Sequence, residues 1–142
     1  MSLPLNYNKA FWIQTATIVN PAAGADFLVT VPAGVTWYVI AVNATLVTSA
    51  TAATRVPQIQ IKDSGGHLLY MESGQSQIAS LTGIWSWAPA VPTSQANNVA
   101  VVPLPAELYL QGGATIGTTT PNIQAGDQWS NISVYVLQLA EA

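Results

Sequence analysis

The sequence contains no cysteine among its 142 residues. This excludes disulfide bonds, thiolate nucleophiles and cysteine-ligated metals, and it leaves the redox compartment undetermined. Charge is also scarce: Asp, Glu, Lys and Arg make up 6% of the chain, against about 25% in an ordinary soluble domain. The surface must therefore consist mainly of uncharged polar and small residues. Because charge opposes association, we expect a homo-oligomer or a larger assembly.

Positive charge is limited to Lys9, Arg55 and Lys62, and the net charge is −3. No basic track is available to bind a phosphate backbone, so nucleic acid is not expected as a partner. The uncharged region from Ser73 to Ala106 is interrupted throughout by Gln, Ser, Asn, Pro and Gly, which argues against a membrane-spanning helix. The first residues lack the basic start and apolar run of a secretory signal. We therefore expect no membrane association.

Side chains that could carry out acid–base or nucleophilic chemistry are few. His67 is the only histidine, and it directly follows a Gly-Gly turn, where an exposed residue is expected. Asp63 and Glu72 flank the same predicted hairpin, where carboxylates serve turn capping and solvation. The segments around Asp63 and Asp127 each offer one carboxylate, which is too few for calcium. We expect no enzymatic activity, no cofactor and no metal site.

The clearest local pattern is a β-hairpin after residue 57. Apolar Ile59 and Ile61 alternate with polar neighbours from Gln58 to Lys62, which is typical of a half-buried strand. The following Asp63-Ser64-Gly65-Gly66 supplies residues that tolerate positive φ, and a third strand is expected from His67 to Glu72.

A longer strand is predicted from Thr36 to Leu46. Its even positions from Ile40 to Leu46 are apolar, and the facing odd positions Asn43 and Thr45 are polar. Trp37 and Val39 break this alternation at the start of the strand. Either both faces are covered there, or a β-bulge exchanges the two faces.

About eight or nine such strands recur along the chain, and no segment has convincing helical periodicity. Val99 to Leu104, Ala114 to Thr119 and Trp129 to Leu139 are among them, and Ala88 to Asn98 reads as the most loop-like stretch. We therefore predict an all-β fold, an antiparallel β-sandwich that is jelly-roll-like. Residues 1–10 are predicted to form an extended N-terminal arm, and residues 11–142 a single sandwich domain.

Five tryptophans are unusual in a chain of this length. Trp85 and Trp87 are two residues apart, so their rings share one face of a strand. Such residues usually fill a core or a subunit contact, which is the interpretation we favour. The alternative is an exposed aromatic row that binds sugars.

The predicted arm is a candidate partner-binding segment. It is rich in apolar and aromatic residues and has one charge, so exposing it fully would be costly; a floppy terminus is the alternative. The candidate partner-binding residues are Leu3, Pro4, Leu5, Tyr7, Phe11 and Trp12.

Three stretches in order, VPAGVTWYVIAVNATLVTSATAATRVPQIQIKDSGGHLLY, PLPAELYLQGG and IQAGDQWSNISVYVLQL, resemble small β-sandwich virion proteins of tailed bacteriophages. The resemblance spans roughly Phe27 to Leu139 and is greatest to the capsid decoration, or cement, class. The chain departs from that class in having few cations on its strands.

The resemblance implies a non-enzymatic protein of the capsid surface, made in the bacterial host cytoplasm. Such proteins form trimers or dimers on an icosahedral shell and bridge neighbouring copies of the major capsid protein. For this chain a trimer is favoured and a dimer is possible. The alternative is a receptor- or carbohydrate-binding module of a phage tail or head fibre, which would use Trp85 and the loop from Ala88 to Asn98.

Overall fold

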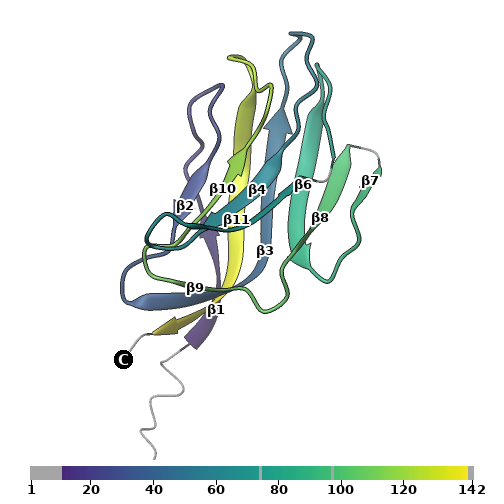
Figure 1. Ribbon diagram of the computed structural model, residues 1–142. Helices are drawn as coiled ribbons and strands as arrows, with labels where there is room; N and C mark the ends of the chain where they lie inside the picture. Colours follow the sequence, from purple (N-terminus) through teal and green to yellow (C-terminus); the bar gives the residue numbers. More distant parts are fainter. Residues whose placement is uncertain (1–10, 74, 97, 141–142) are drawn as a thin grey trace, which may run out of the picture.

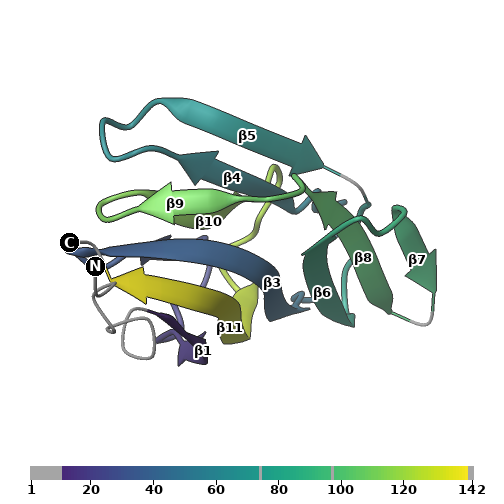
Figure 2. The ribbon, with the colours of Figure 1, turned by 90° about the horizontal axis from the view of Figure 1, so that it is seen from below.

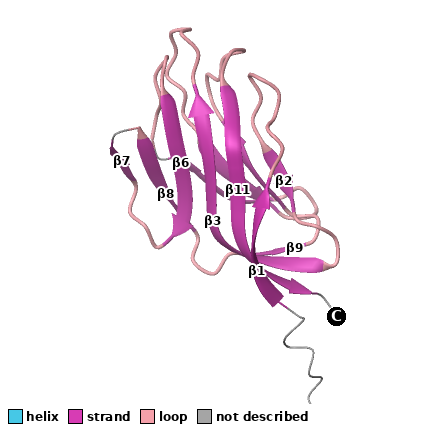
Figure 3. Ribbon diagram, turned by 180° about the vertical axis from the view of Figure 1, so that it is seen from behind, coloured by secondary structure: helices cyan, strands magenta, loops and turns pink. Residues whose placement is uncertain are grey.

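The computed structural model describes residues 11–73, 75–96 and 98–140, with the backbone alone for residues 11–17 and 73 (Figure 1). These residues form eleven strands and no helix (Figure 3). The strands make two sheets that pack against each other, so the prediction of an all-β sandwich is confirmed. The jelly-roll topology and the arm stay predictions, and residues 1–10 lie outside the described part of the chain.

The larger sheet has seven strands in the order β1-β11-β3-β6-β8-β7, with β9 also paired to β3. These strands are β1 (Phe11–Thr17), β3 (Val35–Val47), β6 (Thr82–Pro89), β7 (Ser94–Ala96), β8 (Val99–Leu104), β9 (Tyr109–Gln111) and β11 (Gln128–Ala140). The smaller sheet has the order β2-β10-β4-β5. Its strands are β2 (Leu28–Thr30), β4 (Gln58–Lys62), β5 (Leu68–Ser73) and β10 (Thr115–Thr119).

One strand pair departs from the antiparallel arrangement of the others. β6 and β8 run parallel, because the chain passes outward after β6, forms β7 at the sheet edge, and returns to insert β8 between them. β7 lies inside the stretch from Ala88 to Asn98 that was predicted to be a loop. Its three residues are all exposed, so the sequence has no alternation of apolar and polar residues that would predict this strand.

A β-bulge resolves the conflicting pattern at the start of β3. The strand buries odd-numbered residues before position 40 and even-numbered residues after it. Consecutive residues Tyr135 and Val136 of β11 pair with Ala41 and Val39, so Ile40 is an extra residue. The bulge exchanges the two faces of the strand, which was one of the two predicted alternatives.

β11 carries a second bulge near its start. Ser130 pairs with Thr45 and Ser133 with Asn43, which leaves one additional residue in β11. Asn131 lies within this bulge with a φ of 49°, a conformation that asparagine adopts more readily than most residues. As a result β11 buries Trp129 and, three residues later, Ile132.

The core lies between the two sheets and is unusually aromatic. Phe27 packs edge-on against Trp129, with ring centroids 5.3 Å apart. Trp87 lies between Trp129 and Trp85, at 6.3 and 6.0 Å from them. All four side chains are buried, which confirms the interpretation of Trp85 and Trp87 as core residues. A sugar-binding row built on these two tryptophans is therefore wrong, because neither ring reaches solvent.

Candidate functional site

Of the predicted partner-binding residues, only Phe11 and Trp12 fall within the described part of the chain. Leu3, Pro4, Leu5 and Tyr7 are outside the described residues, and the side chains of Phe11 and Trp12 are not described either. The backbones of Phe11 and Trp12 begin β1 and pair with Leu139 and Gln138 of β11. The described part of the chain therefore begins beside the last described residues of β11.

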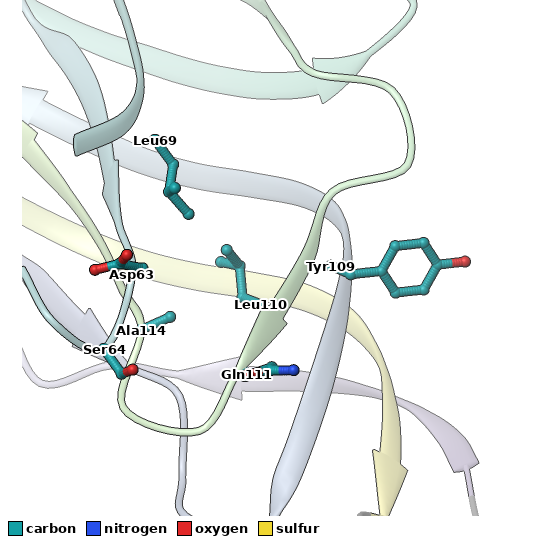
Figure 4. A pocket seen from close by; sticks show the side chains of 7 residues that line it. All are labelled: Asp63, Ser64, Leu69, Tyr109, Leu110, Gln111 and Ala114. Carbon is teal, nitrogen blue, oxygen red and sulfur yellow. The ribbon is translucent and has the colours of Figure 1, made fainter. Parts of the chain in front are cut away.

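An open hollow of about 180 Å³ lies at the same end of the molecule (Figure 4). Ligand and cofactor pockets usually occupy about 300–1,000 Å³, so this hollow suits a side chain better than a cofactor. Figure 4 shows the Tyr109 ring turned away from the other lining side chains; it packs on Tyr38, with ring centroids 4.9 Å apart. The lining residues are Asp63, Ser64, Leu69, Tyr109, Leu110, Gln111 and Ala114.

The turn between β4 and β5 forms one wall of this hollow. Asp63 Oδ1 accepts hydrogen bonds from the backbone N–H groups of Gly65 and His67, both at 2.9 Å. Its Oδ2 lies 3.0 Å from Nδ1 of the exposed His67 ring. The backbone bond from His67, followed by the bond with its ring, lowers the pKa of the Asp63 carboxyl. The predicted turn-capping role of Asp63 is therefore confirmed.

Strand β5 presents an apolar free edge. Within the described residues, β4 is the only strand paired with it in the sheet, and on the inner side the Tyr70 hydroxyl donates to the carbonyl oxygen of Pro103 in β8 at 2.9 Å. Leu68, Leu69 and Met71 expose 53%, 54% and 47% of their surface, and Leu69 also lines the hollow. An exposed apolar edge of this kind is a template for pairing with another strand, and soluble proteins usually protect it. This edge and the adjoining hollow are the candidate interaction site.

A buried ion pair at the other end of the core was missed by the sequence analysis. Arg55 and Asp127 are both fully buried, and two nitrogens of the guanidinium donate to the two carboxylate oxygens at 2.8 and 2.9 Å. The backbone N–H groups of Ser49 and Gln124 also donate to Asp127, each at 2.8 Å. Arg55 donates further to the carbonyl oxygen of Ala53 at 2.7 Å. This network joins the loop between β3 and β4 to the loop between β10 and β11, which are far apart in the sequence.

Burial in the pair with Asp127 removes Arg55 from the surface of the protein. With Arg55 buried, Lys62 is the only Lys or Arg with solvent access in the described part of the chain. Neither partner has a sequence signal of its own, because the two residues are 72 positions apart and each stands in an ordinary loop of small residues. The only related feature of the sequence is its small number of Lys and Arg residues.

Acid should reveal the contribution of Asp127 to stability. Burial opposes ionisation of this carboxylate, but hydrogen bonds from Arg55, Gln124 and Ser49 outweigh it and lower its pKa from 3.8 to about 2. Because the folded-state pKa lies below the unfolded one, the stabilisation is complete above about pH 4 and is lost as the pH falls toward 2. We expect this loss to amount to about 2–3 kcal/mol.

Urea unfolding at a series of pH values would measure this loss. The variant Asp127→Ala should lack this part of the pH dependence while keeping that of the other carboxylates. Parallel pH profiles for the two proteins would contradict the assignment.

No group of three or more His, Cys, Asp or Glu side chains that could hold a metal ion occurs among the described residues. The same residues include no helix able to span a membrane. Comparisons with protein-family models, curated proteins and solved structures found no match for this chain.

Proposed function

We propose that this chain is a structural virion protein, a capsid decoration protein that binds the outside of an icosahedral phage shell. The observation that supports this most strongly is a charge-poor surface with an exposed apolar strand edge at Leu68, Leu69 and Met71. Such a surface loses little favourable hydration when a neighbour covers it, and it gains the burial of apolar area. This is the behaviour expected of a protein whose working state is an assembly.

In this proposal the protein acts mechanically and is not an enzyme. Each copy bridges adjacent copies of the major capsid protein, and it does so as a homo-oligomer, with a trimer favoured over a dimer. The arm at residues 1–10 supplies an apolar grip on a neighbour. Several weak contacts engaged together produce strong attachment, and binding to the assembled shell stabilises it against rupture.

The number of copies in the particle tests this function. Quantitative mass spectrometry of purified virions should find this chain in the hundreds, in a simple ratio to the major shell protein, because a decoration protein follows the symmetry of the lattice. The internal standard is the shell protein itself, measured in the same digest. A handful of copies would indicate a fibre or tail component instead, and absence from the particle would remove the virion proposal.

A further inference from the structure

We propose that β5 is a docking edge and that its occupant is the segment of residues 1–10 from a second copy of this chain. The inference rests on the proposed function in one respect, that the arm grips a neighbour. It adds where the arm binds and in what form: as an extra strand, hydrogen-bonded along the free edge of the smaller sheet. Extended peptides commonly bind sheets in this way, with the backbone supplying affinity and alternate side chains supplying specificity.

The first support is that β5 is poorly protected against strand addition. The opposite edge of the same sheet, β2, has only three residues, whereas β5 has six. Short strands, charges, prolines and β-bulges are the usual protection of an edge, and of these β5 has one bulge near its start and one charge. β5 contains one charged residue, Glu72, and no proline. Its bulge at Leu69 lies near the start of the strand, so Tyr70 to Ser73 offer a regular row of backbone groups to an added strand.

The second support is that a bulge in β5 places two apolar side chains on the same outer face. Leu68 pairs with Lys62, and Met71 pairs with Gln60. Lys62 and Gln60 are two residues apart and so point to one face of β4, which brings their partners Leu68 and Met71 to that face as well. Without the extra residue in β5, these two side chains would point to opposite faces.

The third support is that the arm complements this edge. Leu3, Leu5 and Tyr7 are at alternate positions, so in an extended conformation they share one face. Backbone groups also alternate along a strand, so the missing N–H of Pro4 faces away from β5 when Leu3 and Leu5 bond to it. The one charge of the arm, Lys9, is opposite in sign to the one charge of β5, Glu72.

Geometry indicates a second copy rather than the chain's own arm. β1 and β5 lie on opposite sides of the sandwich (Figure 2). Phe11 of β1 pairs with Leu139 of β11, Leu139 pairs with Thr36 of β3, and Thr36 pairs with Gln111 of β9. These three strand spacings amount to about 14 Å, and the smaller sheet lies about 10 Å further. If six arm residues pair along β5, about four remain, and they span roughly 13 Å. The chain's own arm is too short to do both.

Cysteine cross-linking in solution tests this inference, because the natural chain has no cysteine. Copies carrying Leu5→Cys are mixed with copies of different mass carrying Met71→Cys, and disulfide heterodimers are counted under mild oxidation. Leu28→Cys is the matched control, since Leu28 is an exposed leucine (65%) on the other edge of the same sheet. Docking should raise heterodimer yield with Met71→Cys about tenfold or more over the control, because it raises the local thiol concentration.

Two further variants make the outcome decisive. Leu68→Lys in the Met71→Cys copy places a charge on the edge and should return the yield to the control level, while circular dichroism confirms that the sandwich stays folded. A single chain carrying both cysteines should form dimers and larger species. Equal yields at Met71 and Leu28 would overturn the docking site, and a cross-link within one chain would overturn the second copy as occupant.

The purified protein suffices for these experiments, and copies per virion are measured separately. A failed cross-link with hundreds of copies per particle would reject this inference alone. A successful cross-link with no copies in the particle would instead reject the virion function.

Discussion

Replacing Asp127 with alanine is expected to lower the free energy of unfolding by about 3–5 kcal/mol. The substitution leaves the guanidinium of Arg55 fully buried without its counterion, and it also removes the acceptor for the backbone N–H groups of Ser49 and Gln124. Breaking one side of a buried ion pair costs more than the pair contributes, because the remaining charge cannot be hydrated. Urea unfolding followed by tryptophan fluorescence measures the change.

The matched control is Glu107→Gln, which removes the same charge from an exposed position. We expect a change within about 0.5 kcal/mol for this variant. The double replacement Arg55→Met with Asp127→Leu should recover much of the loss, because it removes both charges and keeps the volume apolar. A loss below about 1 kcal/mol for Asp127→Ala would mean that the pair contributes no more than a surface ion pair does.

Replacing Trp129 with alanine is the second large effect, with an expected loss of about 3–5 kcal/mol in the free energy of unfolding. The indole is completely buried and contacts the rings of both Phe27 and Trp87. Phe27 precedes β2 of the smaller sheet, while Trp87 and Trp129 belong to the larger one. Removing the central ring therefore leaves a cavity between the two sheets, which the surrounding strands can fill only in part.

The more conservative variant Trp129→Phe separates packing from hydrogen bonding. Nε1 of Trp129 is buried and has no hydrogen-bond partner among the described residues, so phenylalanine keeps an aromatic ring and removes an unsatisfied donor. We expect it to lose clearly less stability than Trp129→Ala does. Trp85 makes a contrast, because its Nε1 donates to the buried side-chain oxygen of Gln77 at 2.9 Å; Trp85→Phe should therefore cost more than Trp129→Phe.

Local pattern was enough to predict the strands that alternate cleanly. The hairpin of β4 and β5, with its Asp63 turn, was predicted from period two and turn residues, and Ile59 and Ile61 are indeed fully buried. β8 was predicted with the same bounds that the structure has, Val99–Leu104. These features depend on neighbours within a few residues, so the chain itself carries the information. The all-β class follows from their sum.

Features that depend on distant partners could not be predicted in the same way. The parallel pairing of β6 with β8 depends on where β7 turns back, and the bulge at Ile40 was one of two possibilities until β11 was placed beside β3. The pairing of Arg55 with Asp127 joins loops that no local pattern connects.

The candidate interaction edge could be predicted from the sequence only in part. Composition alone predicted an associating surface, because so few charges are present to keep copies apart. Leu68, Leu69 and Met71 look in the sequence like any half-buried strand. Only the tertiary arrangement makes them exposed, because β5 is the last strand of its sheet and its outer face and free edge have no covering layer among the described residues. Burial is set by what packs against a strand, and a strand's own sequence does not encode the absence of a neighbour.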